Sequence, residues 1–251
     1  MNTTMIRMDT IRYLRSPETL VFTIAMPALL YIVFGATAQY GDYPIGHGNI
    51  NMMILVNMAL YGAATAAVGF TGTGTIDRLR GWGRQLAITP LPDSAAITNR
   101  VISALLITLL PLTVLFFLGQ AMGADAPLTR TVLAFVAIIP LSITFALYGF
   151  AFAYLLRSEV AVTISVGFLV LLGFLGNVFT PLSGWLITIA KFTPMYGPGV
   201  IARYPITGGV RTDEAGVLHT ESLLWACVST GVWILIFGAI TMYAVRRARS
   251  R

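Results

Sequence analysis

Charged side chains are scarce in this sequence. Asp, Glu, Lys and Arg make up 10% of its 251 residues, against about 25% in an average soluble domain. A soluble fold of this size needs a charged surface, and these side chains are too few to form one. Hydrophobic residues make up 57% of the chain, and the mean hydropathy is +0.80. Composition therefore excludes a soluble globular domain and indicates an integral membrane protein.

Several motifs of enzyme chemistry are also absent. The chain has no GxxxxGK[ST] P-loop for a nucleotide and no HExxH pair for zinc. Its single cysteine, Cys227, lies in an apolar run and cannot form a disulfide within the chain. The two histidines, His47 and His219, fall in predicted outer loops, so neither can pair with a serine at membrane depth. We therefore expect no enzyme activity, no catalytic residue, no metal site and no cofactor bound by this chain.

Long apolar runs are what the sequence has instead. A helix needs about 20 residues to cross a hydrocarbon core, whereas the strands of membrane β-barrels alternate over about 10. The runs predict an all-α integral membrane fold, a single transmembrane domain over residues 1–251 with six transmembrane helices. The predicted spans are 20–38, 51–71, 101–122, 131–156, 160–178 and 222–245. Residues 179–192 are apolar but too short to cross, which predicts a re-entrant hairpin after the fifth span, and 193–220 are predicted to be a non-helical extracellular loop.

The basic residues predict the orientation. Arginines gather in the N-terminal segment, the second-to-third connection, the fourth-to-fifth turn and the C-terminal tail. The positive-inside rule places these segments, and with them both termini, on the cytoplasmic side of the membrane. We expect this membrane to be a bacterial plasma (inner) membrane. Residues 4–18 predict an interfacial amphipathic helix, because Met8, Ile11 and Leu14 share one face while arginines meet lipid headgroups. The net charge of +6 therefore reflects membrane topology, and we expect no nucleic-acid partner.

No Asp, Glu, Lys, Arg or His lies within any of the six predicted spans. Ion-coupled transporters usually need such groups as proton or ion relays. This argues against a proton-coupled antiporter. Sodium coupling through carbonyls and hydroxyls stays open, since it needs no carboxylate.

The second-to-third connection has an unusual pattern for a loop. Leu79, Trp82 and Leu86 follow one another at spacings of three and four, which predicts one apolar face of a short helix over residues 75–88. Pro90 and Pro92 then end the helix. A charged helix with an apolar ridge fits docking into the groove of a partner, and equally a helix that lies on the membrane surface.

This connection resembles the cytoplasmic loop of ABC-2 type exporter permeases. The resemblance rests on Asp77, Arg78, Gly81, Trp82, Gln85, Leu86, Thr89, Pro90 and Leu91. A second stretch resembles the family's signature after the fifth span, through Gly173, Gly176, Pro181, Trp185, Leu186, Ile189, Ala190, Pro194 and Tyr196. The N-terminal pattern of Arg12, Tyr13, Leu14, Arg15, Ser16, Pro17 and Pro27 is also similar. The three motifs stand in the family's order and cover nearly the whole chain.

The resemblance implies a transport subunit that dimerises and binds a separate P-loop ATPase, two copies of each, with ATP and magnesium on the ATPase. It implies that the 75–88 helix is the coupling helix. The residues implied in ATPase coupling are Asp77, Arg78, Leu79, Trp82, Arg84 and Leu86. The chain departs from the family in having one acidic residue, Asp77, before the glycine, and Ala87 where arginine is frequent.

The leading hypothesis is ATP-driven export of a hydrophobic or amphipathic compound, such as a drug, an antibiotic or a lipid-like molecule. The candidate path residues are uncharged, and aromatic, Met and amide groups suit such a cargo. They are Met53, Asn57, Phe168, Phe174 and Asn177. The alternatives are export of a polysaccharide or lipid-linked glycan, an ATP-independent channel or sodium-coupled carrier, and a membrane partner that transports nothing. For each path residue, ordinary helix packing is the competing explanation.

Overall fold

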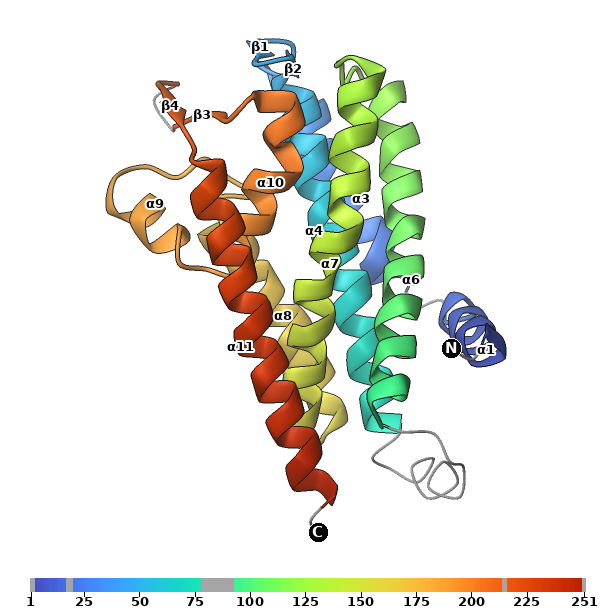
Figure 1. Cartoon of the computed structure of the whole chain (residues 1–251). Helices are drawn as coiled ribbons and strands as arrows, with labels where there is room; N and C mark the ends of the chain where they lie inside the picture. Colours follow the sequence, from blue (N-terminus) through green and yellow to red (C-terminus); the bar gives the residue numbers. More distant parts are fainter. Residues whose placement is uncertain (1–2, 17–19, 78–92, 214–215, 250–251) are drawn as a thin grey trace.

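The computed structural model describes residues 3–16, 20–77, 93–213 and 216–249 (Figure 1). The N-terminal elements are the helix α1 (Thr3–Leu14), the π-helix η1 (Val21–Ala25), α3 (Met26–Tyr31) and the π-helix η2 (Ile32–Ala36). The strands β1 (Pro44–Ile45) and β2 (Gly48–Asn49) precede α4 (Ile50–Asp77), α6 (Asp93–Ala121), α7 (Leu128–Leu156) and α8 (Glu159–Leu175). The chain ends with α9 (Gly184–Ala190), α10 (Tyr196–Thr207), β3 (Val210–Thr212), β4 (Leu218–Thr220) and α11 (Leu223–Arg249).

The long helices run side by side between two ends of the molecule (Figure 1). One end carries the antiparallel hairpins β1–β2 and β3–β4, and we name it the hairpin end. The other carries the last residues of α4 and α11, and we name it the C-terminal end. The helices α4, α7 and α11 run from the hairpin end to the C-terminal end, and α6 runs the opposite way.

The central helix of the bundle is α4, which packs against α6, α7, α8 and α10. Its most apolar stretch is 89% buried within the chain, whereas that of α11 is 22% buried. Small residues allow this close packing. A Cβ atom at Gly62 would lie 3.2 Å from the side chains of Pro27 and Pro111. Glycine therefore lets two other helices approach the α4 backbone closely.

Four of the predicted spans are helices of spanning length and composition: Ile50–Asp77, Ile97–Ala121, Leu128–Leu156 and Leu223–Arg247. The predicted first and fifth spans form shorter apolar helices, Val21–Ala36 and Val160–Leu175. The structure thus supports an all-helical, multi-pass membrane protein, and a count of six complete spans stays a prediction. The predicted fifth span ends early because the chain turns at Gly176 and at Asn177, whose φ is 58°.

The first apolar segment is divided by two π-helical turns. The Met26 N–H donates to the Val21 carbonyl and the Thr37 N–H to the Ile32 carbonyl, each five residues back. Pro27 has no N–H to donate and occupies the first turn of α3. The wider π turns keep the segment helical on both sides of that turn.

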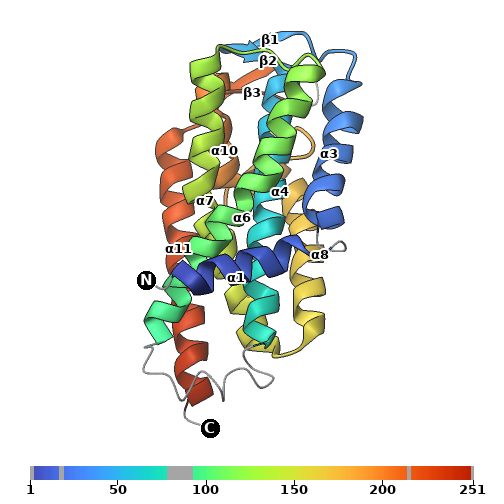
Figure 2. The same cartoon turned by 90° about the vertical axis from the view of Figure 1, so that its right-hand side faces the viewer.

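The helix α1 lies across the bundle at a steep angle to α4 and α6 (Figure 2). Met8 and Ile11 are exposed on it, as are Arg7 and Arg12, whereas Tyr13 is buried. This orientation is the one expected of a helix in the membrane interface. The helix over 3–14 agrees with the predicted 4–18 segment, of which residues 17–18 lie outside the described part of the chain. Its interfacial position stays a prediction.

The prediction that residues 193–220 are non-helical is wrong, because α10 occupies Tyr196–Thr207 and packs against α4, α7 and α11. The glycines and prolines of this stretch have low helix propensity and predict a loop. Packing against neighbouring helices nevertheless stabilises a helix here. A Cβ atom at Gly197 would lie 2.6 Å from Thr230 Oγ1 and 2.7 Å from the Ala226 carbonyl oxygen of α11. Glycine at this position lets α10 and α11 pack closely.

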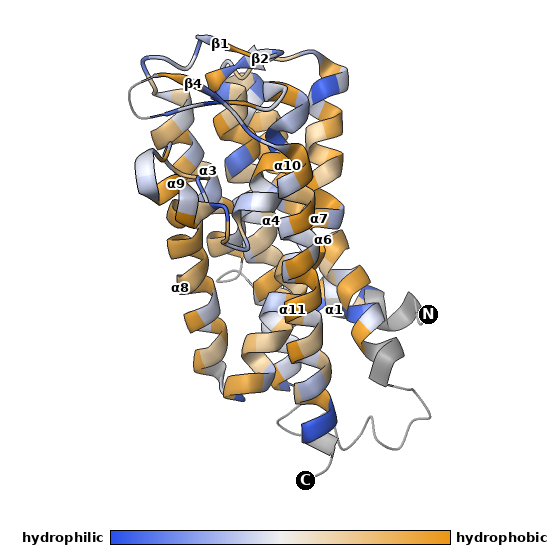
Figure 3. Cartoon of the chain, turned by 60° about the vertical axis from the view of Figure 1, so that its left-hand side comes forward, coloured by the Kyte–Doolittle hydropathy of each residue, from blue (hydrophilic) through white to orange (hydrophobic). Residues whose placement is uncertain are grey.

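Apolar residues cover the outer faces of α7, α8 and α11, while polar residues gather at the two ends (Figure 3). Leu224 and Leu235 of α11 are more than two-thirds exposed, as expected for side chains that face lipid. The predicted re-entrant segment 179–192 contains the seven-residue helix α9, which follows α8 and precedes α10. Its entry into the membrane stays a prediction.

Candidate functional site

Among the described residues, Arg203 and Glu221 form an ion pair that is buried inside the bundle. The Arg203 Nη2 donates to both carboxylate oxygens of Glu221, at 2.7 and 2.8 Å, and its Nε donates to Oε2 at 3.0 Å. The two side chains are only 2% and 1% exposed. A buried charge is costly unless it is paired and hydrogen-bonded, and this planar fork-to-carboxylate geometry meets both needs.

The remaining guanidinium nitrogen connects the pair to two other segments. The Arg203 Nη1 donates to Asn57 Oδ1 in α4 and to the backbone carbonyl of Asn177 beyond α8, both at 3.4 Å. The Asn177 Oδ1 in turn accepts from the Leu182 N–H at 2.9 Å. We name Arg203, Glu221, Asn57 and Asn177 the outer polar cluster. It joins α4, α10 and the segments that follow α8 and precede α11.

Tyr196, in the first turn of α10, adjoins this cluster. Burial, and next to it the Glu221 carboxylate, raise the pKa of the Tyr196 hydroxyl to about 12, from the ordinary value of 10.0. The phenol is therefore neutral at physiological pH and can donate a hydrogen bond to Glu221. It adds a neutral donor on the carboxylate side of the ion pair.

A second ion pair involves Asp77, the last residue of α4. The Arg12 Nη2 of α1 lies 3.1 Å from the Asp77 Oδ2, and the side chains are 70% and 44% exposed. An exposed pair contributes little energy by itself, typically about 0–1 kcal/mol. Its role is to place α1 next to the last residue of α4.

Tyr13 fixes α1 to α4 more firmly. Its hydroxyl donates to the Ala66 carbonyl at 3.4 Å and lies 3.2 Å from Thr23 Oγ1. Its ring meets Phe70 edge to face at 5.4 Å between centroids. On the same turn of α4, the Arg100 guanidinium of α6 lies 4.4 Å from the Phe70 ring centre and donates to the Phe70 carbonyl. Both α1 and α6 are thus held at one point on α4.

Between the two polar ends of α4, threonine hydroxyl groups form hydrogen bonds to the backbone of the same helix. Thr65, Thr71 and Thr75 each donate to the carbonyl four residues earlier in the helix. These bonds remove unpaired donors from the bundle interior without binding another element. The helix therefore connects the outer polar cluster to Asp77 as one continuous element.

Of the residues implied in ATPase coupling, the structure describes Asp77, which is the last residue of α4 rather than part of a separate helix. Arg78, Leu79, Trp82, Arg84 and Leu86 lie outside the described residues, as does most of the predicted 75–88 helix. Their role stays a prediction. Arg12 is one of the arginines predicted to meet lipid headgroups, and it stays 70% exposed while it pairs with Asp77, so that prediction stands untested.

The predicted path residues separate into two groups. Asn57 and Asn177 meet at Arg203, and Met53 is buried on the same helix as Asn57. Phe168 and Phe174 are 49% and 43% exposed on α8. The buried group can face a cargo only after helices repack, whereas the α8 phenylalanines are accessible from outside the chain.

Sequence reasoning misses Arg203 and Glu221, because both lie outside the predicted spans. A signal is present for Arg203, the one charged residue between Lys191 and Arg211 in the sequence, because a lone charge in an apolar stretch needs a partner. Glu221 gives no such signal, because it follows His219 and Thr220 in a polar stretch. Arg211 also contacts the segment before α9, since it donates to the Leu182 carbonyl at 3.0 Å.

A family model, ABC-2 type transporter, matches residues 2–204. This chain belongs to the ABC-2 type transporter family. The match runs from α1 through Arg203, so it includes Asp77 and three of the four residues of the outer polar cluster. No curated protein matches the chain. Family membership identifies this ABC-2 protein as a membrane subunit of a transporter and implies association with an ATPase partner.

Proposed function

We propose that this chain is the permease subunit of an ATP-driven exporter. Two copies form a dimer, and each binds a separate P-loop ATPase subunit that carries ATP and Mg²⁺. In this proposal the C-terminal end faces the cytoplasm of a bacterial inner membrane and the hairpin end faces outward. The cargo is a hydrophobic or amphipathic compound.

The observation that carries the proposal is the continuity of α4. It is a single helix of 28 residues, or about 42 Å at 1.5 Å per residue. Its last residue, Asp77, immediately precedes the segment expected to dock on the ATPase. Near its other end, Asn57 accepts from Arg203 in the outer polar cluster. A displacement at Asp77 would therefore reach the outer half of the bundle through one rigid element.

The exposed aromatic residues support an apolar cargo. Phe168 and Phe174 are about half exposed on α8, and Phe174 meets Phe179 edge to face at 5.0 Å. Phe179 in turn meets Tyr61 of α4 at 4.8 Å. This aromatic row leads from the α8 surface to the central helix and offers adaptable apolar contact. A glycan would need many hydrogen-bonding groups along its path, which this row lacks.

The first test is assembly with an ATPase. The full chain is co-expressed with a candidate P-loop ATPase, solubilised and analysed by size exclusion with mass determination. We expect a complex containing two copies of each subunit. A chain that stays monomeric and never retains an ATPase would overturn the proposal.

The second test is coupling. Trp82→Ala should leave expression and basal ATP hydrolysis intact but abolish ATP-dependent uptake of lipophilic fluorescent dyes into inverted vesicles. Interface anchors of this kind commonly cost about 2 kcal/mol or more on truncation, or about thirtyfold in affinity. The matched control is Trp185→Ala, because Trp185 lies on α9 and is 71% exposed. Dye uptake driven by a sodium gradient without ATP would favour the carrier alternative.

A further inference from the structure

Two carbonyl groups directly after α9 lack the backbone donors that a turn normally supplies. Pro194 stands three residues after Lys191 and has no N–H, so the usual turn bond to the Lys191 carbonyl cannot form. Among the described residues, no backbone N–H donates to the carbonyl of Lys191 or of Phe192. In an apolar environment each of these carbonyl groups needs a donor from another element.

Three side chains of α11 supply these donors. Trp225 Nε1 donates to the Lys191 carbonyl at 3.2 Å, and the Ser229 hydroxyl donates to the same carbonyl at 3.4 Å. Trp233 Nε1 donates to the Phe192 carbonyl at 3.0 Å. The three donors follow one another at a spacing of four, which places them on one face of the helix. We name these three residues the α11 donor row.

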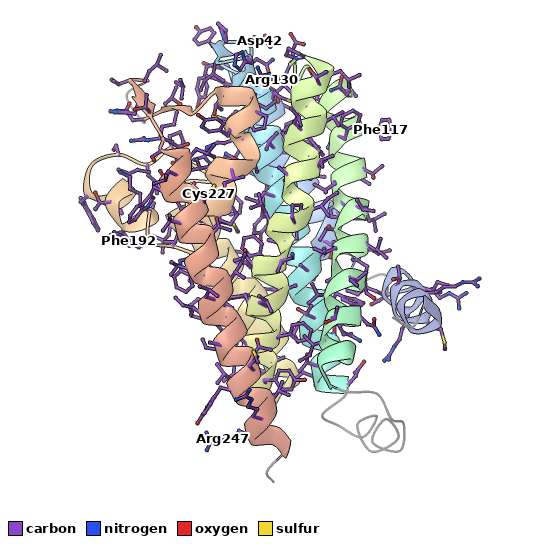
Figure 4. All side chains as sticks on the ribbon, in the orientation of Figure 1. Asp42, Phe117, Arg130, Phe192, Cys227 and Arg247 are labelled. Atoms are coloured by element: carbon purple, nitrogen blue, oxygen red, sulfur yellow. The ribbon has the colours of Figure 1, made fainter. Side chains whose placement is uncertain are left out.

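Packing adds to these hydrogen bonds. Ile187 and Ala190 of α9 belong to a small buried core that also contains Ala226 of α11 and is separate from the main core of the bundle. The Phe192 ring, labelled in Figure 4 where the chain leaves α9, meets the Trp225 ring edge to face at 5.6 Å between centroids. A helix of seven residues is not stable by itself, so these contacts with α11 stabilise α9.

Anchoring in lipid headgroups does not explain the two tryptophans of the row. A tryptophan in that role keeps its ring in an apolar layer and its N–H toward the wet headgroups. Here the indole N–H groups of Trp225 and Trp233 both donate to carbonyls within the chain. Trp225 is also only 38% exposed, whereas Trp185 of α9 is 71% exposed. The tryptophans of the row therefore serve α9 rather than the lipid.

The residues before α9 have different contacts. Phe179 meets Phe174 of α8 and Tyr61 of α4 edge to face, and it belongs to the main core. Leu182, three residues later, already belongs to the small core of α9. The change from one core to the other thus falls at residues 180–181. By its core and its hydrogen bonds, α9 belongs with α11, although it follows α8 in the chain.

We propose that Trp225, Ser229 and Trp233 are positioning residues that fasten α9 to α11, so that α9 keeps its place on α11 throughout transport. The helix α11 is a single element of 27 residues that runs to the C-terminal end. A displacement of α11 at that end would therefore carry α9 with it. The fastening is a property of the chain itself, whereas its use during transport rests on the proposed exporter function.

The fastening is tested by amide hydrogen exchange of the full chain purified in detergent. Three N–H groups at the end of α9 donate to carbonyls of its last turn, so their exchange rates report how often α9 opens. W233F should raise these rates about tenfold, because it keeps an aromatic ring but leaves the Phe192 carbonyl without its donor. W225F should raise them less than about threefold, since Ser229 still donates to the Lys191 carbonyl. W225F/S229A removes both donors and should match W233F.

The matched control is W185F, the same substitution at an exposed tryptophan of α9 outside the donor row. It should change the exchange rates by less than about threefold, and exchange within α6 should stay native in every variant, which shows that the bundle still folds. Equal rates in W225F and W233F would mean that ring packing holds α9 and would overturn the proposal. A rise in W185F as large as in W233F would overturn it as well.

The use of the fastening is tested on the complex with the ATPase. ATP-dependent dye uptake into inverted vesicles should fall further in W233F than in W225F, and exchange of α9 in the native complex should be the same with and without ATP. Normal dye uptake in W225F/S229A/W233F, with α9 exchanging freely, would overturn the role in transport. A native chain that transports no dye would overturn the proposed function instead, and the exchange rates would still decide whether α9 is fastened to α11.

Discussion

Arg203 and Glu221 form a two-pronged ion pair 18 positions apart, with a β-hairpin between them and an Nη2–Oε1 distance of 2.7 Å. Because Arg203 also donates to Asn57 and to the Asn177 carbonyl, a single guanidinium group holds α4, α10 and two connecting segments together. The half of the molecule at the hairpin end is thus organised around one buried charge pair. When the pair is broken inside an apolar bundle, no water is available to hydrogen-bond the separated charged groups.

Removing one member of the pair should therefore be far more damaging than removing a surface charge. We expect Arg203→Ala to destabilise the protein by about 3–5 kcal/mol, because it leaves the Glu221 carboxylate buried and unpaired. Thermal unfolding of the purified chain, followed by size exclusion, measures this. The control is Arg130→Ala, which removes an exposed arginine near the start of α7.

Replacing both residues of the pair tests whether stability is lost because one charge is left unpaired or because the site requires charged residues. We expect R203M/E221L to recover most of the lost stability, since an apolar pair of similar volume avoids the cost of burying charge. If R203A proved no less stable than R130A, the pair would not be a structural centre of the half of the molecule at the hairpin end.

The sequence predicts the four long spans because hydropathy and length decide them, and α4, α6, α7 and α11 all follow that rule. It also singles out Asn57 and Asn177 as polar groups in apolar surroundings. It cannot show that both contact Arg203, because that contact joins residues up to 146 positions apart. Tertiary contacts of this range leave no periodic pattern in the chain.

The prediction of a loop over residues 193–220 fails for a related reason. Glycine and proline are poor helix formers, and their density in this stretch predicts irregular backbone. In the folded chain, Gly197 instead allows α10 to approach α11, and burial supplies the helix with the stability that its own residues lack. Likewise, the sequence pattern of α1 cannot show that Arg12 pairs with Asp77, because the two residues lie 65 positions apart.

Close packing on α4 predicts opposite effects for two glycine substitutions within helices. Gly149→Ala would place a Cβ atom into Thr71 Oγ1 and 2.9 Å from the Val68 carbonyl oxygen. We expect it to lower the free energy of unfolding by about 1–3 kcal/mol through overpacking. The unfolding midpoint in detergent, with the native chain as reference, measures the loss.

The matched control is Gly167→Ala in α8, where a new Cβ atom would meet nothing within 4 Å. Alanine has the better helix propensity, so this variant should be as stable as the native chain or up to about 1 kcal/mol more stable. Equal destabilisation by both substitutions would contradict the tight contact between α7 and α4.

Asn177 is expected to tolerate glycine better than alanine. Its φ of 58° lies in the left-handed region, which alanine enters at a cost of about 1–2 kcal/mol and glycine at almost none. Both variants lose the hydrogen bond that the Leu182 N–H donates to Asn177 Oδ1, so the difference between their stabilities reflects the cost of the left-handed backbone conformation. We expect N177G to unfold at a higher temperature than N177A. The reverse order would place this residue in another backbone conformation.

The contacts of Arg12 and Tyr13 predict that α1 and α4 move as one body during transport. Cys227 is the only cysteine, so a C227S background allows a clean double-cysteine experiment. In that background, R12C/D77C should react with a short bifunctional thiol reagent. The native Arg12 Nη2 and Asp77 Oδ2 lie 3.1 Å apart, and the reagent replaces the length of the arginine side chain. R7C/D77C should react far less, because Arg7 lies more than one helical turn earlier on α1.

The functional readout compares one variant with itself. ATP-dependent dye export by R12C/D77C is measured in vesicles before and after cross-linking with a reagent that contains a cleavable disulfide, and again after its reduction. We expect the three rates to agree within about twofold, because Tyr13 already holds α1 to Ala66 and Phe70 of α4. Export that stops on cross-linking and returns on reduction would show instead that α1 must separate from α4, and would make the Arg12–Asp77 pair a contact that breaks in each cycle.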